Sequence, residues 1–394
     1  MKKKVAIIGG GAAALSLACF LDSSKFEIHL FEKNKALGRK FLVAGKGGFN
    51  LTHGEDIEKM ILRYTPPSFL KTAIKKFSND DFRIWLTSIG VPTFVGSSNR
   101  IYPEKGMKPI DVLRSIQNVI ALNNAKVHLN KTWNGWNEND ELSFVDGENF
   151  KADYAIFAMG GASWKVTGSD GSWKTLFEEK GIKTNTFIPS NCAYKVAWPE
   201  KVKASFSGTP LKNISITCGN QTQKGEVVIT ETGLEGNAIY ALSPNIRKEL
   251  NHGPANISID LKSKLGIEQI ISKLKKSSQK TISKKLRYDL KLSLVKIELL
   301  KEFTPKEVYL DVEKMARKIK SFEIDLIDTA TIDKSISTVG GIDLSELSPE
   351  FELIKQPNTY CIGEMTDWDA PTGGYLLQAC FSMGYYLANH LNNK

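Results

Sequence analysis

The sequence predicts an α/β protein whose first and last segments together form one domain, with the middle of the chain as an insert. The chain begins with an apolar strand, a glycine run and a helix. A β/α pattern returns near residue 332, and residues 190–331 differ in texture from both ends. At 394 residues the chain has room for two or three domains and a large buried core. Hydrophobic residues at 41 % and charged residues at 24 % are ordinary globular values, which exclude a disordered or coiled-coil chain.

The first strand, Val5–Ile8, is wholly apolar and is followed by a glycine run that opens a helix. Gly9, Gly11 and Ala14 occupy the three key positions of the dinucleotide-binding pattern G-x-G-x-x-G/A. The first permits a tight turn, the second lets a pyrophosphate approach the backbone, and the third lets the helix pack closely on the strand. The helix start then offers free N–H groups to the phosphates. We therefore place a dinucleotide against Gly9, Gly11, Ala13 and Ala14.

The second strand, Phe26–Phe31, ends in Glu32, which lies 23 residues after Gly9. An acid at this spacing is placed to accept hydrogen bonds from an adenosine ribose. Lys33 follows directly, and we place it beside the same ligand. A strand–turn–helix unit that binds nothing is the alternative.

A loop from Gly38 to His53 carries four glycines and three cations. This composition suggests backbone that wraps closely around an anionic ligand, although a mobile surface loop would have a similar composition. The residues that we expect along the cofactor here are Gly38, Arg39, Lys40, Gly45, Gly47, Asn50 and Thr52.

The remainder of the first segment continues the α/β pattern. A buried strand over 154–157 ends in small residues, so we add Ala158 and Gly160 to the candidate cofactor contacts. The other elements that we expect are helices over 67–89 and 110–122, a strand over 125–129 and a hairpin over 133–145.

The middle of the chain has two textures. Residues 190–260 are β-rich, and residues 261–331 are helical and rich in lysine. Lys262–Lys320 holds 17 basic and seven acidic residues, a net charge that equals the +10 of the whole chain, so the remaining residues sum to zero. A nucleic-acid-binding surface therefore does not follow from the overall charge. We expect an appended substrate or cap domain.

The last segment, residues 332–394, holds a second candidate ligand site. A strand leads to Gly363, Glu364 and Asp367, and Gly373-Gly374 then opens a final helix through Leu391. Asp367 is a suitable acceptor for a ribityl hydroxyl. The positive helix end near Gly373 is suited to the pyrimidine edge of a flavin. A nicotinamide cofactor would not need this distant half, so the sequence favours FAD.

With these motifs in place, the chain resembles the bacterial FAD-binding oxidoreductases of the HI0933-like family, also called the BaiN or aminoacetone-oxidase type. The resemblance spans nearly the whole chain, and the loop after the second strand is its most specific part. The matching stretches are Gly9–Ala14, Gly38–His53, Ala158–Gly161, Thr338–Ile342 and Gly363–Tyr375.

The resemblance implies a glutathione-reductase-type (Rossmann-like) FAD-binding domain over residues 1–189 and 332–394. The insert over 190–331 would hold a small β-barrel and a helical piece. By motif position, Glu32 would hold the ribose and Val127 would meet the adenine through its backbone. Arg39, Lys40 and Asn50 would lie along the cofactor, and Glu364 and Asp367 would lie near its ribityl–phosphate region.

The long loop departs from the family pattern. Many relatives resemble Ser-Gly-x-Gly-Arg-Cys-Asn, whereas this chain has Gly48 and Phe49 in place of the arginine and the cysteine. No role of that arginine or cysteine carries over, and a difference in substrate is plausible.

Three polar residues are candidates for catalysis beside the flavin. Lys46 could polarise a flavin or substrate oxygen, Arg100 could bind an anionic substrate, and Tyr375, also a candidate cofactor contact, could donate a proton. Each has a structural alternative, namely phosphate neutralisation, a solvated or ion-paired side chain, and packing at the helix start. Neither a metal-ligand spacing nor a Ser-His-Asp set stands out among five dispersed histidines.

We expect an oxidoreductase that acts on a small organic molecule through its flavin, with NAD(P)H as a transiently docked reductant. One alternative is a flavoenzyme that acts on or binds RNA through the basic insert. We do not favour a nucleic-acid partner, because a lysine-rich helical surface is usually only solvated and this one lacks interleaved aromatic residues for stacking, with Tyr288 alone in mid-segment. The others are a flavin-dependent amine oxidase that uses oxygen and a flavin-binding protein without catalysis. The sequence leaves the oligomeric state open.

Composition and targeting signals suggest a cytoplasmic protein. Five cysteines are scattered without a C-x-x-C pair, which fits a reducing compartment. Lys2–Lys4 and the apolar run after them resemble a signal peptide, but the glycine run interrupts that pattern. No other apolar stretch approaches the roughly 20 residues that a membrane helix needs, so we expect no membrane partner.

Overall fold

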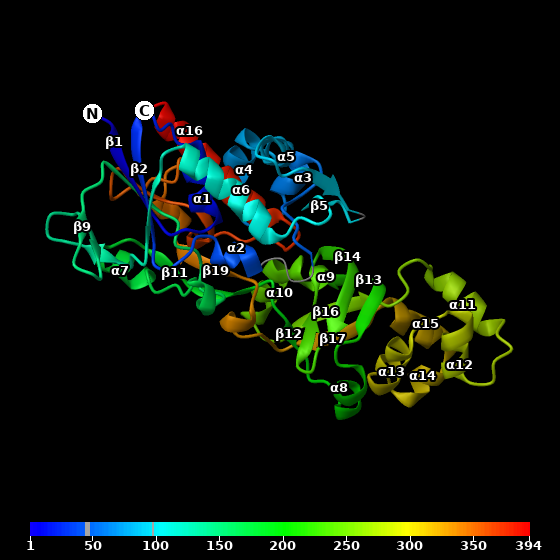
Figure 1. Ribbon diagram of the computed structural model, residues 1–394. Coiled ribbons are helices and arrows are strands. Elements are labelled where there is room, and N and C mark those ends of the chain that lie inside the picture. The colour runs from blue at the N-terminus through cyan, green and yellow to red at the C-terminus, as the bar shows by residue number, and fades with distance from the viewer. Residues whose placement is uncertain (44–47, 97) are drawn as a thin grey trace. The chain divides into compact units, whose positions relative to one another are not determined.

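The structure is a computed structural model that describes residues 1–43, 48–96 and 98–394 (Figure 1). The chain divides into two compact units. Unit 1 holds Met1–Ser190 and Ile332–Lys394, and unit 2 holds Asn191–Thr331. Among the described residues, no helix combines the length and the apolar character that a membrane crossing needs.

Unit 1 is built on a parallel sheet of five strands in the order β20-β10-β1-β2-β6. The first strand of the chain lies at the centre, as in the nucleotide-binding half of a doubly wound fold. This confirms the predicted α/β class with a Rossmann-type sheet. The five strands are β1 (Lys3–Ile8), β2 (Phe26–Glu32), β6 (Lys126–Leu129), β10 (Tyr154–Phe157) and β20 (Thr359–Cys361).

The central strand β1 is apolar because both of its faces are covered. Val5 and Ile7 belong to the core cluster that includes the first and last helices, whereas Ala6 and Ile8 belong to a second cluster on the other side. All four side chains are buried. Successive side chains of a strand point to opposite faces, so a strand between two cores must be apolar at every position.

The other elements of unit 1 surround this sheet. The helices are α1 (Ala12–Phe20), α2 (Arg39–Val43), α3 (Ile57–Ile61), α4 (Pro67–Lys76), α5 (Asn79–Ser88), α6 (Pro109–Leu122), α7 (Lys174–Glu179) and α16 (Tyr375–Asn392). The short strands are β3 (Thr52–His53), β4 (Thr93–Val95), β5 (Arg100–Pro103), β7 (Trp133–Trp136), β8 (Leu142–Phe144), β9 (Asn149–Phe150), β11 (Thr184–Ser190) and β19 (Ser337–Ile342).

The helix expected over 67–89 is two helices, α4 and α5. The first helix ends at Lys76, and Ser78 caps the second, because its side chain accepts from the N–H of Asp81 while the Asp81 carboxylate accepts from the N–H of Ser78. This reciprocal capping box is a start signal inside a continuous apolar pattern.

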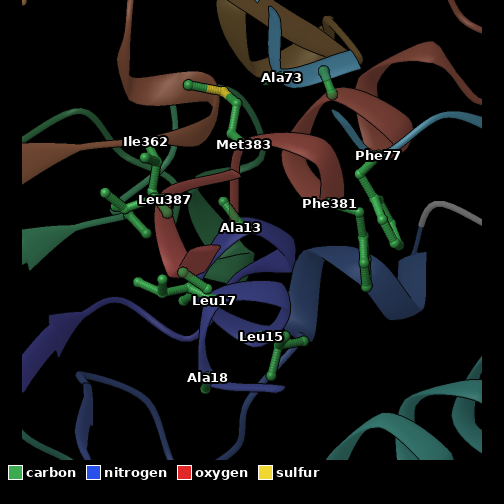
Figure 2. Close-up of a cluster of buried hydrophobic side chains, with 14 of the residues drawn as sticks. Ala13, Leu15, Leu17, Ala18, Ala73, Phe77, Ile362, Phe381, Met383 and Leu387 are labelled. Carbon is green, nitrogen blue, oxygen red and sulfur yellow. The ribbon is translucent and has the colours of Figure 1, made fainter. Parts of the chain in front are cut away.

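Helices α1 and α16, from opposite ends of the chain, pack directly on each other (Figure 2). Their contact includes Ala13, Leu17 and Leu387, all buried. The Ser16 hydroxyl donates to the carbonyl of Phe381 at 2.8 Å. A Cβ on Gly384 would lie 2.7 Å from the carbonyl oxygen of Ala13, so the two backbones approach as closely as glycine allows.

Unit 2 contains an antiparallel sheet of seven strands in the order β17-β16-β13-β14-β15-β12-β18. Its first and last strands are separated in the chain only by Ile327, so one continuous stretch pairs with both edges and closes the sheet. The strands are β12 (Tyr194–Lys195), β13 (Pro210–Cys218), β14 (Gln221–Ile229), β15 (Gly233–Glu235), β16 (Ala255–Asp260), β17 (Phe322–Leu326) and β18 (Asp328–Thr329).

Most helices of unit 2 lie between β16 and β17 in the chain, and their apolar residues share one core cluster with the sheet. Lys296 ties the two parts together, because its buried ammonium donates to the carbonyl oxygens of Lys212 and Leu261. The helices are α8 (Glu200–Phe206), α9 (Asn237–Tyr240), α10 (Ser243–Leu250), α11 (Ile267–Lys275), α12 (Ile282–Lys284), α13 (Leu294–Glu302), α14 (Lys306–Leu310) and α15 (Val312–Lys320), with a π-helical turn η2 (Lys285–Asp289).

Replacing Gly384 with alanine tests the contact between α1 and α16. Helix propensity alone would stabilise the protein by up to about 1 kcal/mol, since alanine favours a helix over glycine. Because the new Cβ would lie 2.7 Å from atoms of α1, we expect Gly384→Ala instead to lower the free energy of unfolding by about 1–3 kcal/mol. Chemical denaturation followed by circular dichroism measures whether the free energy of unfolding falls or rises. Asn389→Ala, exposed on the same helix, is the control. A stabilised Gly384→Ala protein would show that the helices are farther apart.

Candidate functional site

A cavity of about 340 Å³ lies at the carboxyl ends of the parallel strands in unit 1. Its wall includes Ile8, Glu32, Ala158 and Ile362, which end or directly follow the four strands β1, β2, β10 and β20. Ligands of open α/β sheets bind at this edge, and the volume falls in the range of roughly 300–1,000 Å³ that small-molecule sites occupy.

Two helices begin at this cavity. Helix α1 follows Gly11 and helix α16 follows Gly374, and both glycines line the cavity wall. Neither helix start has a capping hydrogen bond from a side chain. The first N–H groups of both helices and the positive ends of both helix dipoles are therefore available to a ligand that carries negative charge.

The three glycines between β1 and α1 lack a side chain for different reasons. Gly9 has a φ of +103°, and a Cβ there would lie 2.5 Å from the carbonyl oxygen of Ala158. A Cβ on Gly10 would lie 2.5 Å from Leu37. Gly11 has a φ of −83°, and a Cβ there would meet only the Ala158 oxygen at 4.0 Å. The protein itself does not require glycine at position 11, whereas a ligand in the cavity would.

Glu32 places a buried carboxylate on the cavity wall. One oxygen accepts from the N–H of Gly10 at 2.8 Å, and the other accepts from the backbone and side-chain nitrogens of Asn34 at 2.7 and 2.6 Å. A carboxylate offers about four lone-pair sites, so at least one remains for a ligand hydroxyl. This is the chemistry expected for recognition of a ribose.

Lys40 and Glu364 form an ion pair on the cavity wall, with 2.7 Å between Nζ and a carboxylate oxygen. Lys40 also donates to the hydroxyl of Ser163, and Glu364 also accepts from the N–H of Thr338. Cys380 lines the same wall. Burial, with the charge of Glu364 adding to it, raises the pKa of this thiol to about 12, so it stays protonated at neutral pH and is not a nucleophile.

A second group of polar residues lies behind the start of α16, and we call it the Glu55 network. The Tyr375 hydroxyl donates to the Glu55 carboxylate, which also accepts from Nε and Nη2 of Arg63 at 3.2 and 3.1 Å. The His53 ring stacks on the Tyr375 ring with 5.0 Å between centroids. A cavity of about 310 Å³, separate from the first, is lined by Glu55.

Burial and charge set the protonation states of the Glu55 network. Burial would raise the pKa of Glu55, but the hydrogen bonds from Arg63 and Tyr375 outweigh it and lower the pKa. Burial, reinforced by Glu55, raises the pKa of Tyr375. The pKa of His53 is lowered, mainly by burial. At neutral pH the network therefore holds an ionised carboxylate, a protonated phenol and a neutral imidazole.

The structure brings most of the predicted cofactor contacts to the wall of the first cavity. Fifteen residues from five separate stretches of the sequence line it together. They are Gly9, Gly11, Ala13, Glu32, Lys33, Gly38, Arg39, Lys40, Asn50, Ala158, Gly160, Gly363, Glu364, Gly373 and Gly374.

Other predicted residues do not line this cavity. Ala14 is buried behind the wall, and Thr52 packs its backbone against Gly374. Val127 lies on the edge strand β6. The Asp367 carboxylate accepts from Asn185 and from the N–H of Gly340, so it ties strands together instead of facing a ligand.

Two of the three predicted catalytic residues lie off the cavity wall. The Tyr375 hydroxyl points to Glu55, and Arg100 lies behind the wall, with its Nε 3.5 Å from where a Cβ of Gly373 would be. Lys46, Gly45 and Gly47 lie outside the residues that the structure describes.

Several residues that line the cavity were not predicted from the sequence. Lys131, Thr132 and Trp133 line the cavity just after β6, where the carboxyl end of a parallel strand is itself the signal that could have found them. Asp170 lines it as well and pairs with Lys33 at 2.7 Å. Its stretch is rich in small residues, which favours passage near a ligand but does not single out one side chain.

Comparison with known proteins identifies the family. The family model described as HI0933-like protein Rossmann domain matches residues 3–390. The 3-dehydro-bile acid delta(4,6)-reductase of Clostridium scindens is 25 % identical over 401 residues, which cover 97 % of each chain. A ribosomal RNA dihydrouridine synthase of Haemophilus influenzae is 25 % identical over 402 residues, which cover 98 % of each chain.

Solved structures support the fold. The crystal structure of a 3-ketosteroid-delta4-(5alpha)-dehydrogenase from Rhodococcus jostii matches with a TM-score of 0.51 and 12 % identity, covering 99 % of this chain and 96 % of that one. At this identity the likeness concerns the fold alone. Together with the family match, the findings show that the chain belongs to the HI0933-like family and is an FAD-dependent oxidoreductase.

Proposed function

We propose that FAD binds in the cavity of unit 1 and that the enzyme uses it to reduce a carbon–carbon double bond next to a carbonyl group, with NAD(P)H as reductant. One observation carries the placement of FAD. The cavity joins the bare backbone of Gly11, the Glu32 carboxylate and two uncapped helix starts, which match the pyrophosphate, the ribose and the flavin of one dinucleotide.

In this arrangement each part of the cavity holds one part of the cofactor. Glu32 would accept the ribose hydroxyls, and the start of α1 would hold the pyrophosphate. Glu364, held in place by Lys40, would lie along the ribityl chain. The positive end of α16 would favour negative charge at the flavin end of the cavity. When bound, the flavin supplies the acceptor and donor of hydride.

The names of two relatives support the double-bond chemistry. A bile acid delta(4,6)-reductase and a dihydrouridine synthase, by their names, add hydrogen to a ring, in one case a steroid and in the other a pyrimidine base. A double bond conjugated to a carbonyl group is electrophilic and accepts hydride at its far carbon, and a proton completes the reduction. We take a small organic molecule of this kind as the substrate class.

A uridine in RNA is the second candidate substrate. The relative that is named for this reaction covers 98 % of this chain. The excess of basic residues in Lys262–Lys320 favours a polyanionic substrate as well. The hydride chemistry would be the same in both cases.

Anaerobic titration of the purified protein with NADH and then NADPH tests the reductant. We expect one of the two to bleach the absorbance of the oxidised flavin, because the proposed reaction needs a hydride donor. The same reduced protein should then be reoxidised by an enone or by uridine-containing RNA. A flavin that stays oxidised with both nucleotides would contradict the NAD(P)H part and direct attention to amines as donors.

Valine at position 11 tests the placement of the pyrophosphate. The backbone at Gly11 suits any residue, so Gly11→Val should fold with the thermal stability of the wild-type protein without FAD, yet retain less than a tenth of its FAD. Gly9→Val is the matched contrast, because its φ of +103° and its contact with Ala158 should prevent folding altogether. The measurements are the ratio of flavin to protein absorbance and a melting curve. Full FAD occupancy in folded Gly11→Val would contradict the placement of the pyrophosphate at Gly11.

Phenylalanine at position 375 separates two roles of the tyrosine. Because the hydroxyl donates to Glu55 behind the cavity, we expect Tyr375→Phe to lower the free energy of unfolding by about 1–3 kcal/mol. We also expect it to leave both half-reactions within a few-fold of wild type. A proton donor would behave differently, with normal flavin reduction by NAD(P)H and a loss of about 100-fold or more in substrate reduction. Stopped-flow measurement of each half-reaction distinguishes the two.

A further inference from the structure

We propose that unit 2 carries a docking surface for the phosphate groups of RNA, centred on Lys262, Lys264, Lys273 and Lys291, which we call the lysine cluster. The proposal goes beyond the reductase chemistry, and it rests on the RNA-directed form of the proposed function only for its choice of polyanion. It can fail while the reductase proposal stands, because binding is measured without turnover.

Among the described residues, Glu313 is the one acid of this segment that forms an ion pair with one of the segment's own lysines. Five of the seven carboxylates in Lys262–Lys320 are already engaged. Glu298 and Glu302 pair with Lys201, which comes from outside the segment. The other three act locally: Glu313 pairs with Lys275, Asp311 caps α15, and Asp289 accepts from Ser277.

The basic side chains are therefore left with an excess of positive charge. In the part of the chain that the structure describes, only Lys275 and Lys320 of the 17 basic residues are ion-paired. Lys296 is buried against carbonyl oxygens and is unavailable to a partner. The lysine cluster has no ion pair among the described residues, and Lys264, Lys273 and Lys291 are exposed.

The cluster converges from three places in the chain. Lys262 and Lys264 follow β16, Lys273 lies on α11, and Lys291 follows the turn η2, against which α11 packs. The three other charges act together on half-buried Lys262, whose pKa is lowered first by burial and then by Lys291, Lys273 and Lys264. Asp260, two residues before Lys262, is paired with Lys320. Four like charges come together here, and no carboxylate is among the charges that act on Lys262, so this surface is suited to a polyanion.

An exposed aromatic ring favours RNA over other polyanions. Tyr288 lies on η2, three residues before Lys291, and 62 % of its surface is exposed. It makes no ring contact among the described residues. An exposed ring three residues from a lysine of the cluster can serve as a stacking platform of the kind that single-stranded nucleic acids use, since every base can stack on it. Inorganic polyphosphate or heparin would gain nothing from this ring.

Fluorescence anisotropy with a labelled single-stranded RNA, titrated with the full-length FAD-loaded protein over a range of KCl concentrations, tests the proposal. Four phosphate contacts predict that the logarithm of the binding constant falls with the logarithm of salt concentration with a slope of about −2.8. The variant K262Q/K264Q/K273Q/K291Q should bind at least tenfold more weakly with a slope near zero. The arginine set K262R/K264R/K273R/K291R should bind like wild type.

The control removes the same charge elsewhere. K71Q/K105Q/K151Q/K224Q alters four exposed lysines outside the cluster and should retain wild-type affinity. Flavin reduction by NAD(P)H and the melting temperature should be unchanged in both glutamine sets. Tyr288→Ala should weaken binding about tenfold with the salt slope intact.

Several outcomes would overturn the proposal. Equal loss of affinity in the cluster set and the control set would show that only net charge matters. Heparin or polyphosphate could also bind tightly and lose as much affinity as RNA on Tyr288→Ala. That result would show that the ring does not select RNA among polyanions. Binding to vesicles that contain phosphatidylglycerol, without binding to RNA, would assign the surface to a membrane.

Discussion

The close contact between α1 and α16 is the constraint on which the site depends. Gly384 lets the two helices approach until their backbones touch, and the small residue Ala13 faces both that contact and Gly363. Held in this way, both helices begin at the same cavity, one after the first glycine turn and the other after the last. Positive helix ends from opposite ends of the sequence thus face one cavity.

The two units treat charge in opposite ways. On the cavity wall of unit 1, two ion pairs join distant segments, Lys40 with Glu364 and Lys33 with Asp170. These pairs hold the segments in place. In the helical part of unit 2, most acids serve as caps or pair with a lysine from outside, and among the described residues only two of the 17 basic side chains, Lys275 and Lys320, are ion-paired. Charge there serves the surface rather than the fold.

Much of the fold could be predicted because its signals are local. The apolar strand, the glycine turn and the acid at the end of the second strand are short patterns with a direct physical cause, and the parallel sheet that they predicted is confirmed. The site could be predicted only in part. Glu364 and Asp367 follow the same strand, but the turn over Gly363–Met365 directs one carboxylate to the cavity and the other to strand β19. The spacing of two acids does not reveal such a turn, nor does it reveal that the Tyr375 hydroxyl finds Glu55.

The order of the chain has a consequence for synthesis on the ribosome. All of unit 2 is made before β20 and α16, which complete unit 1. Until then the apolar faces of β1 and α1 lack their cover, and the cavity lacks one of its two helix starts. The domain that is begun first is thus the last to be finished, so a nascent chain carries exposed apolar surface while the inserted unit folds. Helix α16 both closes the core and completes the wall of the cavity.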